Sequence, residues 1–219
     1  MDLGRLILVT DRQQAGGREL VDLVDAALGA LPPACALVQL REKDLSPREL
    51  YGLARRLLEV THRHRCQLLI NDRIDVALAA GADGVHLPEL GLPIAVARRL
   101  GRPGSFIVGV SVHGADAAGA AARDGADLVV CGPIWQTPSK QGLGEPLGEA
   151  ALAQARRAMA GAGAATRLYA IGGVIGTAEA EAAVRAGAHG VAVVRAVMAA
   201  AEPGAAARAL YDAMPDSRP

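Results

Sequence analysis

Aromatic residues are scarce in this chain, and its charge has no excess of either sign. Phe, Trp and Tyr make up 2% of the 219 residues, and 23 basic side chains face 23 acidic ones. Proteins that bind single-stranded nucleic acid stack bases on aromatic rings, and proteins that bind duplexes or anionic membranes carry basic surfaces. We therefore expect no nucleic-acid partner and no membrane-surface partner.

Long hydrophobic runs are also lacking, and cysteine is rare. No apolar run approaches the roughly 20 residues of a membrane span, and the N-terminus shows no signal-peptide core. Cys35, Cys66 and Cys131 are odd in number, widely spaced and without metal-ligand spacing. This usage fits a reducing compartment, so we expect a cytoplasmic protein in which Cys131, in a predicted strand, is a small core residue.

A strict alternation of apolar strands and amphipathic helices fills the chain. The predicted strands are Leu6–Thr10, Ala36–Leu40, Gln67–Asn71, Gly84–Leu87, Phe106–Val112, Leu128–Gly132, Arg167–Gly172 and Gly190–Arg195. The predicted helices are Glu19–Ala30, Pro47–Arg63, Ile74–Ala80, Ile94–Leu100, Ala115–Asp124, Glu149–Ala158, Ala178–Ala186 and Ala205–Ala213.

Eight strand–helix units in this length predict an α/β protein, a single (β/α)8 TIM barrel over residues 1–219. A weak repeat, in which Gly81, Gly125 and Gly187 each end a helix just before a strand, supports the barrel. A doubly wound open sheet is the alternative. The count of eight and the absence of a GxGxxG motif after the first strand weigh against it.

The second strand closes on an unusually polar segment, Gln39-Leu40-Arg41-Glu42-Lys43. Alternation along an extended chain points Gln39, Arg41 and Lys43 to the same side. Two cations and an amide on one side suit an anion such as a diphosphate. The alternative is a solvated junction with surface ion pairs.

The other strands also end in polar or glycine residues, and active sites of barrels lie at this end of the strands. We therefore predict a ligand site there, built from Thr10-Asp11-Arg12, Asn71-Asp72-Arg73, His86, Ser111-Val112-His113, the loop holding Thr137, Ser139 and Lys140, Gly172-Gly173 and Arg195.

Several of these residues have two interpretations. Gly172-Gly173 could bind phosphate through backbone N–H groups or simply form a tight turn. The loop with Lys140 could close over an anion or be a solvated loop. Asp72 could bind Mg²⁺ or cap the following helix. A lone histidine is commonly structural, and His113 is a better candidate for chemistry than His86.

Seven short motifs, in this order and spacing, make the chain resemble the thiamine phosphate synthase and thiazole tautomerase family from the first strand to the eighth. They are Gln39-Leu40-Arg41-Glu42-Lys43, Ile70-Asn71-Asp72-Arg73, Gly81-Ala82-Asp83-Gly84-Val85-His86-Leu87, Gly109-Val110-Ser111-Val112-His113, Gly132-Pro133-Ile134, Thr137-Pro138-Ser139-Lys140 and Ile171-Gly172-Gly173.

The resemblance implies small phosphorylated pyrimidine and thiazole substrates. In the synthase, an aminopyrimidine methyl diphosphate loses pyrophosphate, and the thiazole phosphate nitrogen attacks the resulting cation. By motif match, Gln39, Arg41, Lys43 and Asn71 hold the pyrimidine diphosphate, and Asp72 binds Mg²⁺. Ser111, Thr137, Ser139 and Lys140 close on pyrophosphate and substrate phosphate. Gly172 and Gly173 bind the thiazole phosphate, with Val194 and Arg195 in the same substrate site. Arg41, Lys43, Ser111 and Lys140 are the catalytic candidates of this reaction.

Two departures from the family pattern keep alternatives open. Gly91 stands where the synthases have a second Mg²⁺-binding Asp, although Glu89 could reach in, and Arg195 stands where the family commonly has Ser. The Leu-Pro sequence after His86 resembles the tautomerase branch, which needs no metal and would use His113 as its general acid/base. A non-catalytic member that binds a pathway phosphate is the third possibility. The sequence leaves open whether the chain forms a homo-oligomer.

Overall fold

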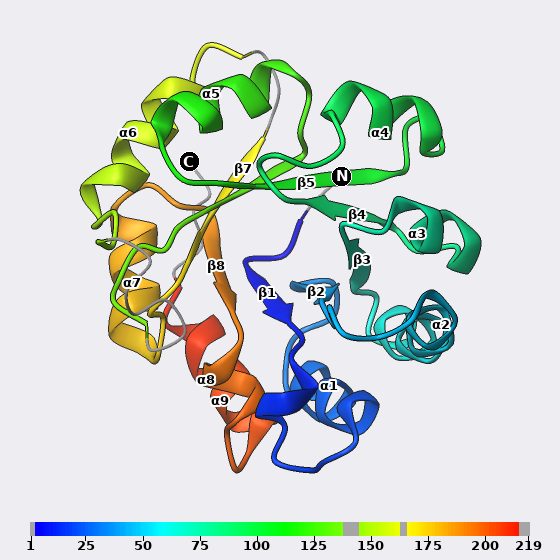
Figure 1. Cartoon of the computed structure of the whole chain (residues 1–219). Helices are drawn as coiled ribbons and strands as arrows, with labels where there is room; N and C mark the ends of the chain where they lie inside the picture. The colour runs from blue at the N-terminus through cyan, green and yellow to red at the C-terminus, as the bar shows by residue number, and fades with distance from the viewer. Residues whose placement is uncertain (1–2, 138–144, 163–165, 215–219) are drawn as a thin grey trace.

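Eight parallel strands close into a barrel in the computed structural model, which describes residues 3–137, 145–162 and 166–214. Each strand pairs with the next along the chain, and the eighth pairs with the first (Figure 1). The predicted barrel is thus confirmed and the open sheet is excluded. The strands are β1 (Leu6–Val9), β2 (Ala36–Leu40), β3 (Gln67–Asn71), β4 (Gly84–Leu87), β5 (Ile107–Val112), β6 (Leu128–Cys131), β7 (Arg167–Ile171) and β8 (Gly190–Val193).

Helices surround the barrel, as Figure 1 shows. Eight of them match the predicted ones to within two residues at their boundaries. These are α1 (Leu20–Gly29), α2 (Pro47–Arg63), α3 (Ile74–Ala80), α4 (Ile94–Leu100), α5 (Ala115–Arg123), α6 (Ala150–Met159), α7 (Thr177–Arg185) and α9 (Pro203–Asp212).

Two short helices were not expected. The 3₁₀ helix η1 (Arg12–Gln14) follows β1, and α8 (Arg195–Met198) follows β8. The predicted eighth strand is therefore too long, because the chain leaves the extended conformation at Val194 and enters α8 at Arg195.

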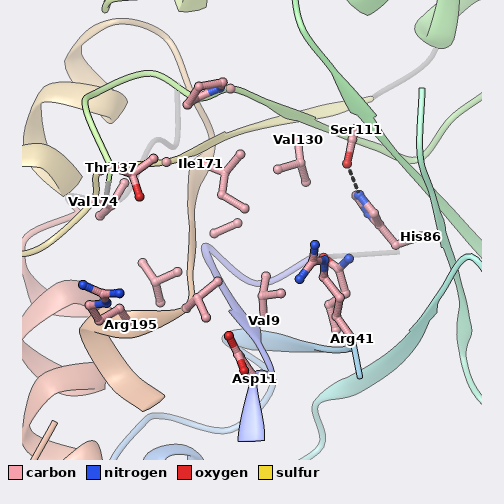
Figure 2. A pocket seen from close by; sticks show the side chains of 18 of the residues that line it. Val9, Asp11, Arg41, His86, Ser111, Val130, Thr137, Ile171, Val174 and Arg195 are labelled. Atoms are coloured by element: carbon pink, nitrogen blue, oxygen red, sulfur yellow. Dashed lines mark hydrogen bonds between the residues drawn. The ribbon is translucent and has the colours of Figure 1, made fainter. Parts of the chain in front are cut away.

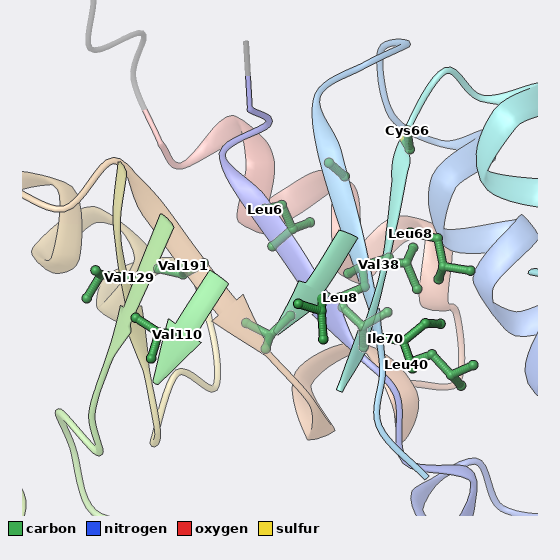
Figure 3. Close-up of a cluster of buried hydrophobic side chains, with 14 of the residues drawn as sticks. Leu6, Leu8, Val38, Leu40, Cys66, Leu68, Ile70, Val110, Val129 and Val191 are labelled. Carbon is green, nitrogen blue, oxygen red and sulfur yellow. The ribbon is translucent and has the colours of Figure 1, made fainter. Parts of the chain in front are cut away.

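Two apolar layers hold the barrel together, one on each face of the sheet. The outer layer lies between strands and helices and includes Leu6, Leu8, Val38, Leu40 and Leu68 (Figure 3). The inner layer fills the barrel itself, with Ile7, Val9, Leu37, Leu69, Ile107, Leu128, Val130, Tyr169 and Ala192. Adjacent residues of one strand thus belong to opposite layers, which explains the continuous apolar runs. Cys131 is fully buried in the outer layer, as predicted.

Inward-facing positions change from apolar to polar along several strands. On β2, Leu37 is followed two residues later by Gln39, and on β3 Leu69 is followed by Asn71. The amino end of the barrel is therefore a packed apolar core, and the carboxyl end presents polar groups to a ligand.

The connections at the amino end of the barrel use glycine as predicted. Gly81, Gly125 and Gly187 have φ of 76°, 88° and 102°, which other residues rarely adopt. These turns are structural and lie away from the polar end. None of the described helices is long and apolar enough to cross a membrane.

Tyr169 provides a test of the inner core. Its ring is fully buried, and its hydroxyl donates a hydrogen bond of 2.6 Å to the Gly4 carbonyl. We expect Tyr169→Phe to lower the free energy of unfolding by about 1 to 3 kcal/mol, because the Gly4 carbonyl loses its partner. Urea unfolding measures this. Tyr51→Phe, at a position that is 42% exposed, is the matched control and should stay within about 0.5 kcal/mol. Equal losses in both variants would refute the interpretation.

Candidate functional site at the carboxyl ends of the strands

A cavity of about 440 Å³ opens at the carboxyl ends of the strands (Figure 2). This volume is in the range that holds a small organic ligand. All eight strands or the segments that follow them contribute to its wall. The lining residues are Val9, Asp11, Gln14, Gln39, Arg41, Asn71, His86, Ser111, Val112, His113, Val130, Gly132, Pro133, Gln136, Thr137, Ile171, Gly172, Gly173, Val174, Ile175, Ala192, Val193, Val194 and Arg195.

The structure brings most of the predicted site residues to this cavity. Those that line it are Gln39, Arg41, Asn71, Ser111, His113, Thr137, Gly172, Gly173, Val194 and Arg195. Lys43 and Asp72 lie outside the lining, and both are exposed. Ser139 and Lys140 fall in 138–144, outside the described residues.

The placement of Lys43 follows from where β2 ends. The strand stops at Leu40, and the chain then turns, with the Leu45 amide donating to the Glu42 carbonyl. Alternation therefore aims Gln39 and Arg41 into the barrel but does not continue as far as Lys43.

Backbone and carboxylate contacts fix the segment that carries Arg41. The fully buried Thr10 accepts a hydrogen bond of 2.9 Å from the Arg41 backbone N–H. The buried Glu42 carboxylate accepts from the backbone N–H of Arg12 at 3.1 and 3.2 Å. The Arg12 guanidinium also binds Asp44 through two nitrogens, at 2.7 and 2.5 Å, and lowers the pKa of that carboxyl. The exits of β1 and β2 are thus joined on both sides of Arg41.

A pair of amides occupies one wall of the cavity. Gln39 Nε2 donates to Asn71 Oδ1 at 2.9 Å, and Gln39 is 4% exposed. This bond leaves Gln39 Oε1 as an acceptor and Asn71 Nδ2 as a donor. A ligand with one donor and one acceptor side by side, as in an amino-substituted heterocycle, would satisfy both.

His86 was predicted at the strand end that faces the ligand site, as a weaker candidate for chemistry than His113, and it lines the cavity. It is 2% exposed, and its Nε2 lies 2.9 Å from Ser111 Oγ (Figure 2). Burial, and then the positive charge of Arg41, lower the pKa of His86 to about 4. The imidazole is therefore neutral near pH 7.

Asp11 and Gln14 are further lining residues that the sequence interpretation did not assign to the substrate. The Asp11 carboxylate caps η1 by accepting from the Gln13 N–H at 3.0 Å, which holds it at the rim of the cavity. The polar end of the first strand was the signal for Asp11. Gln14 depends on η1, which the sequence did not reveal.

Two guanidinium groups lie on opposite sides of the cavity, Arg41 on one and Arg195 on the other (Figure 2). Neither forms an ion pair with any side chain in 3–137, 145–162 or 166–214. Unpaired guanidinium groups facing a concave site are typical of anion recognition. Because they lie on opposite sides, they can contact two different anionic groups of bound ligands.

The turn after β7 requires glycine at both positions. Gly172 and Gly173 have φ of 90° and 75°. A Cβ atom at Gly172 would lie 2.6 Å from Pro133, and one at Gly173 would lie 2.5 Å from Trp135. The backbone of this turn therefore lies against the loop after β6 and lines the cavity without side chains in between.

The donor set for a metal ion is small. No group of three or more His, Cys, Asp or Glu side chains that could hold a metal occurs in the described part of the chain. Asp72 is exposed and has a φ of 63°, a conformation that concentrates at functional sites. It does not cap α3, because Arg73 is the N-cap residue and makes no side-chain cap bond.

The loop after β4 carries the other candidate metal ligand, and it is already engaged. Glu89 Oε2 lies 2.6 Å from Nδ1 of His113. The Gly91 amide donates to the Pro88 carbonyl, and a Cβ atom at Gly91 would lie 2.8 Å from the Pro88 ring. An aspartate at position 91 would therefore require this turn to rearrange.

These features define a class of protein: a (β/α)8 barrel whose polar end surrounds a cavity suited to anions. Within that class, the sequence model of the thiamine monophosphate synthase family matches residues 6–197. The chain belongs to this family.

The relatives agree with this assignment. A protein of Geobacter sulfurreducens is 48% identical over 210 residues, which cover 96% of this chain and 94% of the relative. The thiamine-phosphate synthase of Roseiflexus castenholzii is 43% identical over 95% of this chain and 87% of its own length. Among solved structures, thiamine phosphate pyrophosphorylase from Pyrococcus furiosus superposes with a TM-score of 0.81 at 29% identity, covering 95% of this chain and 94% of the other.

The hydroxyl of Thr10 offers a test of how Arg41 is held. In Thr10→Val the Arg41 amide loses its acceptor in a partly buried place, so we expect a loss of about 1 to 3 kcal/mol in unfolding free energy. We also expect faster hydrogen exchange at the Arg41 amide. Thr10→Ser keeps the acceptor and is the matched control. If the Arg41 amide exchanges at the same rate in Thr10→Val, in Thr10→Ser and in the unaltered protein, the hydrogen bond to Thr10 does not hold this segment.

Proposed function

We propose that this protein is a thiamine phosphate synthase, which joins an aminopyrimidine methyl diphosphate to a thiazole phosphate and releases pyrophosphate. The observation that carries the proposal is the placement of two guanidinium groups, Arg41 and Arg195, on opposite sides of one cavity, where neither forms an ion pair within the described residues. The reaction brings together two substrates that each bear phosphate, so a site for both needs two separate anion contacts. Family membership and the names of the relatives, thiamine-phosphate synthase and thiamine phosphate pyrophosphorylase, support the same reaction.

The pyrimidine diphosphate belongs on the Arg41 side. There, the amide pair of Gln39 and Asn71 presents one acceptor and one donor, which match the amino group and a ring nitrogen of an aminopyrimidine. Arg41 then meets the diphosphate as its bond to the pyrimidine methylene breaks. A cation placed where negative charge develops stabilises the transition state.

The thiazole phosphate belongs at the opposite wall. Backbone N–H groups of Gly172 and Gly173 and the guanidinium of Arg195 would hold its phosphate, with Val194 beside them. Thr137 lies at the loop end of this wall. The assigned roles of Ser139 and Lys140, contact with pyrophosphate and phosphate, remain predictions, as does the role of Lys43.

Mg²⁺ fits this site if substrate supplies most of its ligands. Mg²⁺ is commonly held by one or two carboxylates plus substrate phosphates, and Asp72 offers one exposed carboxylate beside Asn71. Bound there, Mg²⁺ would neutralise charge on the leaving diphosphate. Glu89 is a weaker candidate for the second carboxylate because His113 already binds it.

The tautomerase alternative receives no support from the relatives described above, which are named thiamine-phosphate synthase or thiamine phosphate pyrophosphorylase. His113 lines the cavity, but its contact with Glu89 is equally compatible with a structural role. An assay of which reaction the protein catalyses, synthesis or tautomerisation, decides between the two.

Product formation tests the proposal directly. We expect thiamine phosphate from the two substrates with Mg²⁺ and none with EDTA. In Arg41→Met we expect the rate to fall about 100-fold or more, because the developing charge loses its counter-charge. Arg185→Met, at an exposed arginine of α7, is the matched control and should keep full activity. No product from folded protein in Mg²⁺ would refute the proposal.

A second pair of variants separates the synthase from the tautomerase. Asp72→Ala should abolish thiamine phosphate formation by removing the carboxylate assigned to Mg²⁺, whereas His113→Ala should retain it. Both are assayed for synthesis and for proton exchange on the thiazole carboxylate phosphate. The reverse pattern, with exchange lost only in His113→Ala, would favour the tautomerase.

An aspartate can be introduced at position 91 together with a change at Pro88, the residue that its Cβ would contact. Gly91→Asp alone should lower stability because its Cβ meets Pro88. Pro88→Gly with Gly91→Asp removes the contacts with the proline ring and leaves one of 3.0 Å to the carbonyl of residue 88, and we expect this double variant to lower the Mg²⁺ concentration at half-maximal rate. An unchanged Mg²⁺ requirement in the double variant would mean that this loop does not serve the metal.

A further inference from the structure

His86 is a buried imidazole that the mechanism above does not use. It lies on β4 beside Asn71 of β3 and Gly109 of β5, and it lines the cavity. A Cβ atom at Gly109 would lie 2.7 Å from His86 Nδ1, so glycine at that position makes room for the ring. The lack of a side chain on the neighbouring strand thus leaves the space that the imidazole occupies.

The two ring nitrogens of His86 have different surroundings. Nε2 lies 2.9 Å from Ser111 Oγ, whereas Nδ1 is buried and has no hydrogen-bond partner in the part of the chain that the structure describes. A neutral imidazole carries one N–H. If Nδ1 carried it, a buried donor would be left without an acceptor, which is rarer in proteins than an unused acceptor. The proton therefore belongs on Nε2, where it is donated to Ser111.

This choice decides what Ser111 offers to a ligand. If His86 donates, the Ser111 oxygen accepts and the hydroxyl hydrogen is free to point into the cavity that Ser111 lines. With the other tautomer, the hydroxyl hydrogen would point at His86, and only oxygen lone pairs would face the cavity. Only the first arrangement attracts an anionic oxygen.

We propose that His86 is a positioning residue that, as the Nε2–H tautomer, turns the Ser111 hydroxyl into a donor toward an anionic phosphoryl oxygen of the substrate. His86 itself does not touch the reacting atoms. This inference rests on the proposed function for the identity of the substrate. The tautomer and the binding of an anion can be measured without turnover.

The tautomer is tested on the unaltered protein. The ¹⁵N chemical shifts of labelled histidine distinguish a protonated ring nitrogen from a bare one, and the chain has five histidines. The signals that disappear in His86→Gln are those of His86. We expect protonated Nε2 and bare Nδ1. A proton on Nδ1 would overturn the proposal whatever the variants do.

Anion binding is tested with inorganic pyrophosphate by calorimetry. We expect Ser111→Ala and His86→Leu each to weaken binding about 10- to 100-fold, the effect of losing one hydrogen bond to a charged group. The double variant should be no weaker than either single one, because both remove the same interaction. His86→Gln, which can still donate to Ser111, should recover most of the affinity.

A histidine at the other end of the barrel is the matched control. His189 Nε2 lies 2.9 Å from the Leu3 carbonyl, and His189→Gln should leave pyrophosphate affinity unchanged. Circular dichroism establishes that each variant is folded. Additive losses in the double variant, or unchanged affinity in folded His86→Leu, would overturn the proposal. If the protein binds pyrophosphate with this pattern yet makes no thiamine phosphate, the proposed function fails and this inference stands.

Discussion

The two-residue period of the strands, inside a sheet closed on itself, is the constraint on which the rest of the structure depends. Each strand has one row of side chains toward the helices and one toward the barrel interior. The inward row cannot be polar at the amino end, where Ile7, Leu37, Leu69 and Tyr169 pack together. It can be polar only where the barrel opens, and that is where Gln39, Asn71, His86 and Ser111 lie. The apolar core and the polar site are therefore formed by opposite ends of the same inward-facing rows of side chains.

Because the site stands on these rows, its charged groups are positioned by buried contacts. Arg41 is the clearest case. Its backbone is held by Thr10, and the next residue, Glu42, is tied to the backbone of Arg12. The guanidinium itself has no ion-pair partner in the described residues. The protein thus fixes the base of the side chain and leaves its charge for a ligand, as preorganised anion sites require.

The same constraint explains what the sequence could predict and where prediction failed. Apolar runs and terminal glycines located all eight strands, and residues that continue the strand period, such as Gln39 and Arg41, were correctly placed in one cavity. Lys43 was expected on the cavity side, but the chain turns before it reaches that position. The two-residue period of a strand does not predict where the strand ends and a turn begins. His86 was placed at the predicted site but ranked below His113, because a lone histidine on an apolar strand carries no signal about its partners. Only the structure shows an unsatisfied Nδ1 and a contact with Ser111.

In the loop after β4, where the resemblance leads us to expect an aspartate at position 91, the structure differs by more than one missing carboxylate. Pro88 occupies the space that a Cβ atom at position 91 would need, and the adjacent Glu89 is bound to His113. Glycine at position 91 is therefore part of a turn that excludes a side chain there. Meanwhile the cavity lining carries two guanidinium groups, Arg41 and Arg195, and one carboxylate, Asp11. A lining with two fixed cations and one carboxylate favours phosphorylated groups, because each carboxylate that is absent also removes a repulsion. Under the proposed function, Arg41 and Arg195 would share the neutralisation of substrate phosphate charge with Mg²⁺ rather than replace it.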